Sequence, residues 1–280
     1  MLETSILKTL VYSDRFNYPL KKDEIWKWLV EKSTKEKVMR VLERLIAAKA
    51  IGKKNEYFFL PGKAETVSLR LKREKISRKK IFVAQRAVKK LKAIPFIKFI
   101  GLTGALSMNN ADENDDIDLL IITAKDTLWL IRIIIWLMCP ICQIRRRKPK
   151  DQEFKDKICF NLFLDEAELE IKEKNLFIAH EICQVKPLLN KDNTYEKFLF
   201  TNSWVDKYLP NIAPVTGCCL PGTSNGLLSF FNKIAFRVQY LYMKSNITNE
   251  KVSLHQAFFH PKILSATILR GLDKKENQWI

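Results

Sequence analysis

The sequence has no apolar run long enough to cross a bilayer. A spanning helix needs about 20 apolar residues, whereas the most apolar stretch, Leu128–Cys142, is shorter and contains Arg132. We therefore predict that residues 126–142 form a helix packed across a sheet. The opening segment MLETSILKTL carries an acidic side chain at position 3 and lacks the apolar core of a signal peptide. We expect a cytoplasmic protein without a membrane span.

The spacing of cysteine and histidine predicts no metal site. The six cysteines are irregularly spaced, and no second pair accompanies Cys139 and Cys142 to complete a zinc ribbon. This pair ends a long apolar helix, whereas a reactive thiol pair lies at a helix N-terminus, where its pKa falls. His180 is expected on a helix face, and His255 and His260 have no ligand partners at suitable spacing. We expect reduced thiols.

Positive charge is concentrated in the first third of the chain. The net charge is +18, and residues 1–100 hold 26 Lys and Arg against 10 Asp and Glu, whereas residues 101–280 hold 23 against 21. A basic segment joined to a nearly neutral one is typical of a polyanion-binding module attached to another domain. A solvated basic surface is the alternative. The apolar fraction of 47% is sufficient for a substantial core.

Residues 1–63 have the pattern of a winged-helix domain. Apolar spacing predicts helices at 4–13, 22–31 and 34–49, followed by a two-stranded hairpin at 50–60. In the nucleic-acid-binding reading, the third helix enters the major groove of DNA and lysines of the hairpin contact phosphates. A protein-docking module is the alternative, since many winged helices bind no DNA.

Residues 64–94 are predicted to form a basic helical connector. Its Lys and Arg residues are Arg70, Lys72, Arg73, Lys75, Arg78, Lys79, Lys80, Arg86, Lys89, Lys90 and Lys92. Apolar residues are sparser, as expected of a partly exposed helix. The connector either extends a nucleic-acid-binding surface or forms a solvated spacer. Pro95 ends it and leads into a strand.

The segment Phe99–Thr123 carries the strongest candidate site. An apolar run leads into Thr103 and Gly104, and the segment ends with Asp116 and Asp118 at the start of an apolar strand. Alternate residues of a strand share a face, so these two residues are about 7 Å apart along it. Their carboxylates repel each other unless a cation lies between them, and carboxylates with substrate phosphates are usual ligands of Mg²⁺. An acidic turn that caps a buried strand is the alternative.

These residues resemble the motif of nucleotidyltransferases of the DNA polymerase β superfamily. The family has an apolar residue, Gly, then Gly or Ser, a spacer, and Asp-x-Asp on a strand. The resemblance implies that Asp116 and Asp118 hold Mg²⁺ on an NTP, and that Gly104 and the N–H of Ala105 bind its phosphates. Ala105 stands where Ser is usual, so this chain lacks the hydroxyl that would bind phosphate.

The resemblance also implies a third metal-binding carboxylate on the next strand, which we predict at Ile158–Leu164. Asn161 is the polar residue in this position. Its amide oxygen can coordinate a cation, but it carries no charge and is a poor base. We include Asn161 with the two aspartates as a candidate catalytic residue. Asp165 or Glu166, at the end of the strand, is the alternative third carboxylate.

The rest of the chain is predicted to be mainly helical from about residue 195. Before that point we expect a short strand at 169–171 and a helix at 175–185. Further helices are expected at 195–208 and 227–244. The aromatic residues of the last helix are predicted to be core residues packed against the sheet.

Together these features predict an α/β (α+β) protein. We expect a winged-helix domain at 1–63, the connector at 64–94, a nucleotidyltransferase-like domain with a mixed sheet at 95–200, and a helical C-terminal region at 201–280. The layout is similar to bacterial nucleotidyltransferase-domain proteins with an N-terminal winged helix. The resemblance implies Mg²⁺-dependent transfer of a nucleotidyl group from an NTP to an acceptor hydroxyl. The alternatives are a nucleic-acid-binding regulator with a degenerate, non-catalytic domain and a toxin–antitoxin-type protein that modifies another protein.

Overall fold

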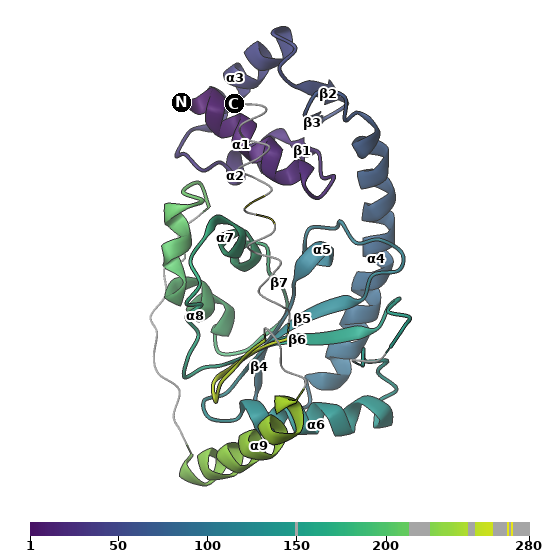
Figure 1. Cartoon of the computed structure of the whole chain (residues 1–280), viewed down its shortest axis with the longest axis vertical. Helices are drawn as coiled ribbons and strands as arrows, with labels where there is room; N and C mark the ends of the chain where they lie inside the picture. The colour runs from purple at the N-terminus through teal and green to yellow at the C-terminus, as the bar shows by residue number, and fades with distance from the viewer. Residues whose placement is uncertain (149–150, 213–224, 246–249, 260–267, 269, 271–280) are drawn as a thin grey trace.

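The structure is a computed structural model that describes residues 1–148, 151–212, 225–245, 250–259, 268 and 270. Within these ranges the chain forms a three-stranded sheet near the N-terminus and a six-stranded mixed sheet, with helices around both. One long helix connects the two parts (Figure 1). The expected mixed α/β class is confirmed. No helix within the described ranges combines the length and apolarity that a membrane span requires.

Three helices and a small antiparallel sheet form the N-terminal part, which we call the N-terminal module (residues 1–60). Its elements are α1 (Leu2–Asp14), β1 (Leu20–Lys21), α2 (Lys22–Lys27), α3 (Lys35–Ala47), β2 (Gly52–Lys54) and β3 (Tyr57–Phe59). The side chain of Thr34 caps α3 by accepting a hydrogen bond from Lys37 N. The helices and the hairpin lie close to their expected positions, although α2 ends earlier and β1 adds a strand in the order β1-β3-β2.

The connector is a single helix, α4 (Glu65–Leu91), as predicted. It begins beside the N-terminal module and runs along one edge of the molecule to the large sheet (Figure 1). Its last turns bury Ala84, Ala87, Val88 and Leu91 in the core beneath the sheet. The connector therefore contributes to both parts of the molecule.

The large sheet has the strand order β7-β4-β5-β6-β9-β8. Its strands are β4 (Ile97–Leu102), β5 (Ile117–Thr123), β6 (Ile158–Asp165), β7 (Lys186–Asn190), β8 (Lys251–Val252) and β9 (Gln256–Phe258). Only β5 and β6 pair in parallel, and the other neighbouring strands are antiparallel. The two central strands are almost continuously apolar because both faces of the sheet are covered.

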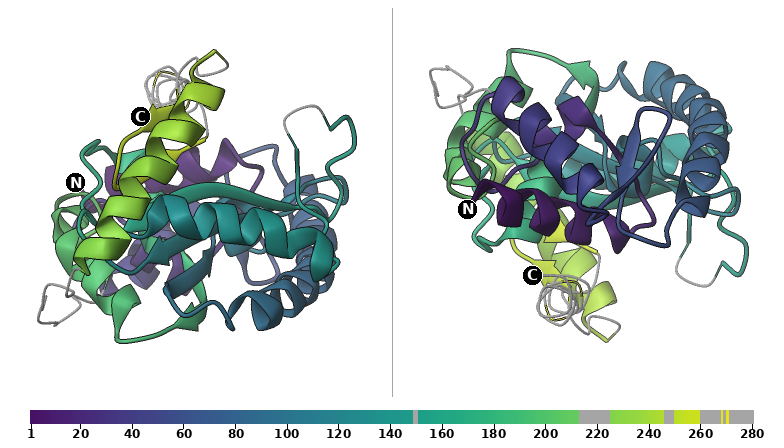
Figure 2. Two further views of the ribbon diagram at one scale, coloured as in Figure 1. Left: turned by 90° about the horizontal axis from the view of Figure 1, so that it is seen from below. Right: turned by 90° about the horizontal axis from the view of Figure 1, so that it is seen from above.

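Helices cover both faces of this sheet. They are α5 (Gly104–Ser107), α6 (Leu128–Ile141), α7 (Leu176–Cys183), α8 (Thr194–Thr201), the 3₁₀ helix η1 (Ser203–Lys207) and α9 (Gly226–Lys244). On β5, Leu120 and Ile122 pack with α7, α8 and the N-terminal module, whereas Leu119 and Ile121 pack with α4 and α6. Figure 2 shows the N-terminal helices lying over the sheet when the molecule is viewed from above.

The prediction of a short strand at 169–171 is wrong, because these residues belong to no strand of the structure. Leu169 and Ile171 are buried, but side chains bind the backbone of this segment where a neighbouring strand would otherwise pair with it. Asn202 accepts a hydrogen bond from Ile171 N and donates one to Leu169 O. Gln256 donates to the carbonyl oxygens of Glu168 and Glu170. The segment is therefore apolar and extended without belonging to a sheet.

The chain after residue 185 contains more strand than expected. β7 includes Pro187, which is tolerated because β7 is an edge strand and its register with β4 shifts at this point. The expectation of a mainly helical chain from residue 195 agrees with α8, η1 and α9, but the two short strands β8 and β9, which extend the sheet beyond β6, were not predicted. Both strands are too short to produce a period-two pattern in the sequence.

Two details of the later helices also differ from expectation. The helix expected at 195–208 breaks at Asn202, whose buried side chain is engaged with residues 169–171. The helix expected at 227–244 is present as α9, but Phe230, Phe231 and Tyr242 are 59%, 48% and 74% exposed. These three aromatic residues are not core residues.

Candidate functional site

The two predicted aspartates lie at the start of β5. Asp116 precedes the strand and Asp118 is its second residue. Asp118 shares a face with Leu120 because alternate residues of a strand point the same way, and that face is turned toward the N-terminal module. One oxygen atom from each carboxylate and the sulfur of Cys159 all lie within 4.8 Å of one another.

Gly104 brings the turn after β4 directly against Asp118. Its φ is +58°, a left-handed conformation that favours glycine. A Cβ atom at this position would lie 2.9 Å from Asp118 Oδ2. Thr103 N also donates a hydrogen bond of 3.1 Å to the backbone oxygen of Asp118. The structure therefore places Gly104 and its neighbour Ala105 beside the second aspartate.

A β-bulge turns Asn161 toward the same carboxylate. The register of β5 and β6 shifts between Leu119 and Leu120, so Asn161 is the extra residue on β6. Its Nδ2 donates a hydrogen bond of 2.8 Å to Asp118 Oδ1, and the residue is 5% exposed. The residue in the predicted third position thus contacts Asp118 through an amide N–H.

Two further residues of the site were not predicted from the sequence. Arg147 Nη1 donates to Asp116 Oδ2 at 2.7 Å, and its guanidinium lies over the ring of Phe154. Cys159 is the register partner of Asp118 on β6. Burial, followed by the charges of the two aspartates, raises the pKa of the Cys159 thiol, so it is protonated at neutral pH.

The prediction that Asp165 or Glu166 supplies the third carboxylate is wrong, because both residues lie at the end of β6 that is distant from Asp118. Asp165 pairs in register with Thr123, at the opposite end of β5 from Asp118. Its side chain accepts hydrogen bonds from the backbone N–H groups of Thr127 and Ala167. Glu166 accepts a hydrogen bond from Thr194 and forms an ion pair with Lys197. Neither can substitute for Asn161.

A cavity of about 300 Å³ opens beside Asp118, between the sheet and the N-terminal module. The large sheet and the turn after β4 contribute five residues to its wall, namely Thr103, Gly104, Ala105, Asp118 and Asn161. Four of the five predicted site residues therefore line one cavity.

The remaining walls of the cavity are largely aromatic. Tyr12, Tyr18 and Trp28 come from the N-terminal module, and Phe177 and His180 come from α7. In Figure 1, α5 and α7 lie below the N-terminal helices. The cavity is therefore formed jointly by the N-terminal module, the sheet and α7.

His180 is part of this aromatic wall. Its ring stacks on Tyr12 with centroids 4.0 Å apart and lies 4.8 Å from the ring of Trp28. Burial and the charge of Lys27 lower the pKa of His180 to about 3. The imidazole is therefore neutral at physiological pH and packs as an aromatic ring.

His255 does have potential ligand partners, contrary to expectation. Its Nδ1 lies 3.7 Å from Asp165 Oδ1 and 3.9 Å from Asp126 Oδ1. These distances suit an ion pair of the protonated imidazole, and contact with Asp165 raises the pKa of His255. The sequence spacing could not predict this cluster, because β9 and β6 bring the residues together. His260 lies outside the described residues.

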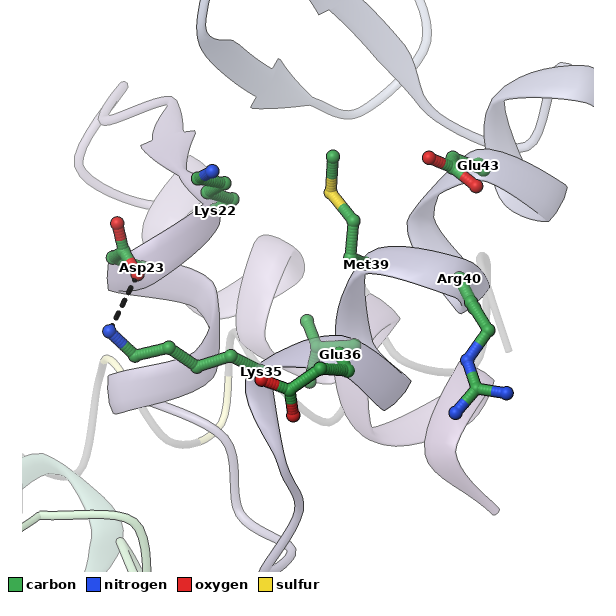
Figure 3. A pocket seen from close by; sticks show the side chains of 8 residues that line it. Lys22, Asp23, Lys35, Glu36, Met39, Arg40 and Glu43 are labelled. Atoms are coloured by element: carbon green, nitrogen blue, oxygen red, sulfur yellow. Dashed lines mark ion pairs between the residues drawn. The ribbon is translucent and has the colours of Figure 1, made fainter.

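The exposed face of α3, predicted to enter a DNA groove, carries both charges. A surface pocket of about 490 Å³ lies between α2 and α3. Figure 3 shows Lys35 reaching Asp23 across it, with Glu36, Arg40 and Glu43 on α3. The Lys35–Asp23 distance is 2.9 Å. Acidic and basic groups thus alternate on this face, which weakens its attraction for phosphates.

The connector helix divides its basic residues between two roles. Arg70 and Lys80 are only 3% and 2% exposed and form internal ion pairs with Glu24 and Asp156. The exposed basic residues of α4, which we call the α4 basic face, are Lys72, Lys75, Arg78, Lys79, Arg86 and Lys89. At 1.5 Å per residue this face extends over about 25 Å.

No protein-family model matches the chain, and no curated protein sequence matches it.

Proposed function

We propose that this protein is a metal-dependent nucleotidyltransferase that uses Asp116 and Asp118. The single observation that carries the proposal is the contact of the glycine turn with Asp118, which lines a cavity and lies beside Asp116. Gly104 follows β4 and the aspartates begin β5, which is the arrangement expected if the turn binds triphosphate and the carboxylates bind its metal. The N-terminal module, with three helices and a three-stranded sheet, is compatible with the proposed winged helix.

The donor atoms fit a divalent cation. Two carboxylates suit Mg²⁺ or Mn²⁺, whereas Cys159 would be a softer donor, favouring Zn²⁺ over Mg²⁺, only if the metal displaced its thiol proton. The missing Cβ at Gly104 leaves Asp118 Oδ2 accessible from the turn side. A bound divalent cation would neutralise charge on the triphosphate and orient it.

The chain's own residues would position the reactants. In the proposed reaction an acceptor hydroxyl oxygen bonds to the α-phosphorus, the bond from that phosphorus to the β-phosphate oxygen breaks, and pyrophosphate leaves. The hydroxyl proton must pass to a carboxylate or to water, because the amide of Asn161 cannot accept it. Asn161 instead orients Asp118 through its N–H. Arg147 is close enough to exchange Asp116 for a phosphate oxygen.

Calorimetric titration with a non-hydrolysable ATP analogue tests this proposal. Binding should require Mg²⁺ or Mn²⁺ and should weaken at least tenfold in Asp116→Ala and in Asp118→Asn. Asp192→Asn is the matched control, because Asp192 is an exposed carboxylate whose ion-pair partner, Lys98, lies at the end of β4 that is distant from Gly104. Nucleotide binding that is indifferent to metal and to both site variants would refute the proposal.

Nucleic-acid binding is a second candidate function, and the α4 basic face is the observation that favours it. Its six exposed Lys and Arg residues have no ion-pair partner among the described residues, and they follow one helix, as a phosphate-binding surface does. This function is compatible with either an active or a non-catalytic site. It assigns phosphate binding mainly to α4, which the sequence predicted only as a possible extension of a surface formed by the third helix and the hairpin.

A further inference from the structure

The cavity beside Asp118 has the wrong charge for a polyanion. None of the described residues that line it is Lys or Arg. Two lining residues are acidic, namely Asp118 on β5 and Glu181 on α7. Away from a metal held by Asp116 and Asp118, a phosphate group in this cavity would therefore lie among aromatic rings and the Glu181 carboxylate without a compensating cation from its walls. A neutral or cationic ligand meets no such penalty.

The aromatic walls indicate the shape of that ligand. Tyr12, Tyr18, Trp28, Phe177 and His180 present rings from two sides of the cavity. Such surfaces bind flat or apolar groups. Lys27 and Arg70 already lie over the rings of Trp28 and Tyr18, so attraction for a cationic substituent comes from the two carboxylates. Glu181 lies beside Gln184 on α7, which donates a hydrogen bond to its carboxylate. The walls thus suit a ring that carries a hydroxyl or amine substituent.

An unpartnered hydroxyl indicates where the polar group of the ligand would lie. Thr103 is 7% exposed, and its Oγ1 is buried without a hydrogen-bond partner among the described residues. Leaving a buried hydroxyl unbonded destabilises the folded state. Thr103 lines the cavity next to Gly104, and its N–H is bonded to the backbone of Asp118. A ligand hydroxyl that reaches Thr103 Oγ1 would therefore also lie close to the Asp118 carboxylate.

We propose that this cavity binds the acceptor, and that the acceptor is a small neutral or cationic molecule with an aromatic or other apolar ring and a hydroxyl or amine group. The role of this ligand as acceptor rests on the proposed nucleotidyltransferase function. Its binding does not, because the binding site is defined by the residues that line the cavity. The proposal excludes a nucleic-acid end as the acceptor, because a nucleic acid would bring phosphates between Asp118 and Glu181.

Three probes of similar shape and different charge test the proposal: 2-phenylethylamine, 2-phenylethanol and 3-phenylpropionate. Each is titrated by calorimetry into the full-length protein without nucleotide or metal. We expect the amine and the alcohol to bind at least tenfold more tightly than the acid. Glu181→Gln should reduce the preference for the amine over the alcohol at least fivefold, whereas Glu153→Gln, an exposed acid outside the cavity, should not change it.

Thr103→Val is a second test, in which ligand binding should weaken although the stability of the folded protein does not fall. Valine has nearly the same shape but no hydroxyl, so the variant should bind 2-phenylethanol at least fivefold more weakly while its melting temperature stays equal or rises. A lower melting temperature with unchanged binding would show that Thr103 is structural and would overturn its assignment to the ligand.

Two further outcomes would overturn the proposal. One is the absence of binding for the amine and the alcohol at 10 mM ligand, a concentration on the order of the weakest specific complexes, or a preference for the acid. The other is competition between the ATP analogue and 2-phenylethylamine for the cavity, which would make it the site of the nucleobase. If the probes bind as expected but Asp116→Ala leaves nucleotide binding unchanged, the nucleotidyltransferase function fails while the ligand site stands.

Discussion

His180 and His255 occupy environments that shift their pKa values in opposite directions. His180 is enclosed by Tyr12 and Trp28, and burial lowers its pKa to about 3. His255 faces Asp165 and Asp126, and contact with Asp165 raises its pKa. Each shift makes the stability of the folded state depend on pH, because the unfolded chain titrates at the ordinary value of about 6.5.

Lowering the pH should destabilise the protein through His180. Below pH 6.5 the unfolded chain binds a proton at this residue, whereas the folded state does not until the pH approaches 3. The loss at pH 5 is therefore about 2 kcal/mol, at about 1.4 kcal/mol per pH unit. Urea denaturation at pH 7.5, 6.5 and 5 measures it, and His180→Phe, which preserves an aromatic ring in the wall, should remove this contribution.

The control for this prediction is His255→Gln. The raised pKa of His255 contributes stability that is fully present below about pH 6.5 and is lost as the pH rises through its folded value. The variant should therefore lose stability at pH 5 relative to the wild-type protein and little at pH 8. If His180→Phe and His255→Gln changed the pH dependence in the same direction, the environments assigned to the two rings would be incorrect.

At the scale of single elements, α4 is held by buried charges as well as by apolar contacts. Arg70 bonds both carboxylate oxygens of Glu24, and it also contacts Glu74 and the backbone of Pro19. Its guanidinium lies over the ring of Tyr18. This network fixes the first half of the helix to α2 and to the strand that precedes it.

Arg70→Ala should therefore destabilise the protein by about 3 kcal/mol, because removing one partner of a buried ion pair leaves the other uncompensated. Arg86→Ala, an exposed position on the same helix, should change the free energy of unfolding by less than about 0.5 kcal/mol. Chemical denaturation compares the two variants. Equal, small effects would mean that Arg70 is solvated in solution and that α4 is not anchored at this point.

The α4 basic face should bind polyanions with a strong dependence on salt. For duplex DNA the slope of log K against log salt is about −0.9 per phosphate contact. Replacing Lys72, Lys75, Lys79 and Arg86 by Gln should therefore flatten that slope by up to about 0.9 for each residue that contacts a phosphate. Fluorescence anisotropy with labelled duplex DNA and RNA at several salt concentrations measures it.

The matched control for this experiment lies on the N-terminal module. The same number of Lys or Arg residues is replaced by Gln, namely Lys22, Lys35 and Arg40 around the pocket of Figure 3 and the exposed Lys37 on α3. Because acidic residues already offset this surface, the control should alter binding less than the α4 variant. A larger effect in the control would return nucleic-acid recognition to α3, as the sequence pattern predicts.

The sequence was informative where a pattern is local and less so where distant segments meet. The apolar periods of α3, α6 and α9 and the strand before Thr123 are contiguous signals, and the structure contains these elements. β7 and β9 gain their stability from pairing with β4 and β6, and β8 gains its stability from pairing with β9. A local pattern of apolar residues does not reveal such pairing. Long basic side chains were also misleading, since burial of Arg70 and Lys80 depends on partners far along the chain.

The same distinction applies to the candidate site. Gly104, Asp116 and Asp118 lie within one segment: strand geometry predicts that the two aspartates share a face, and the resemblance to the nucleotidyltransferase motif adds the glycine turn. Arg147 and Cys159 join them only through the return of the chain from α6 into β6. Asn161 was predicted as a site residue from its position in the expected strand. Its contact with Asp118, however, depends on a β-bulge that the sequence does not reveal.

At the scale of the whole molecule, the N-terminal module and the sheet share one hydrophobic core. A single cluster includes Ile6, Leu29 and Leu42 of the module together with Leu120 and Ile122 of β5. Polar contacts cross the same boundary: Tyr18 OH donates to Met108 O, and Asn211 bonds the backbone of Glu31 and Ser33. The module is therefore packed as part of the core and is not attached by α4 alone.

The protein should consequently unfold in a single cooperative transition. Circular dichroism, which reports all helices, and tryptophan fluorescence, which includes Trp28 of the module, should give the same urea midpoint. Tyr18→Phe removes the bond to Met108 O and should lower both midpoints together, by about 1 kcal/mol in free energy. Two separate midpoints would show that the module detaches first, and the cavity would then open before the sheet unfolds. A ligand of the cavity distinguishes these cases, because 2-phenylethanol should stabilise the whole molecule in the first and only the docking of the module in the second.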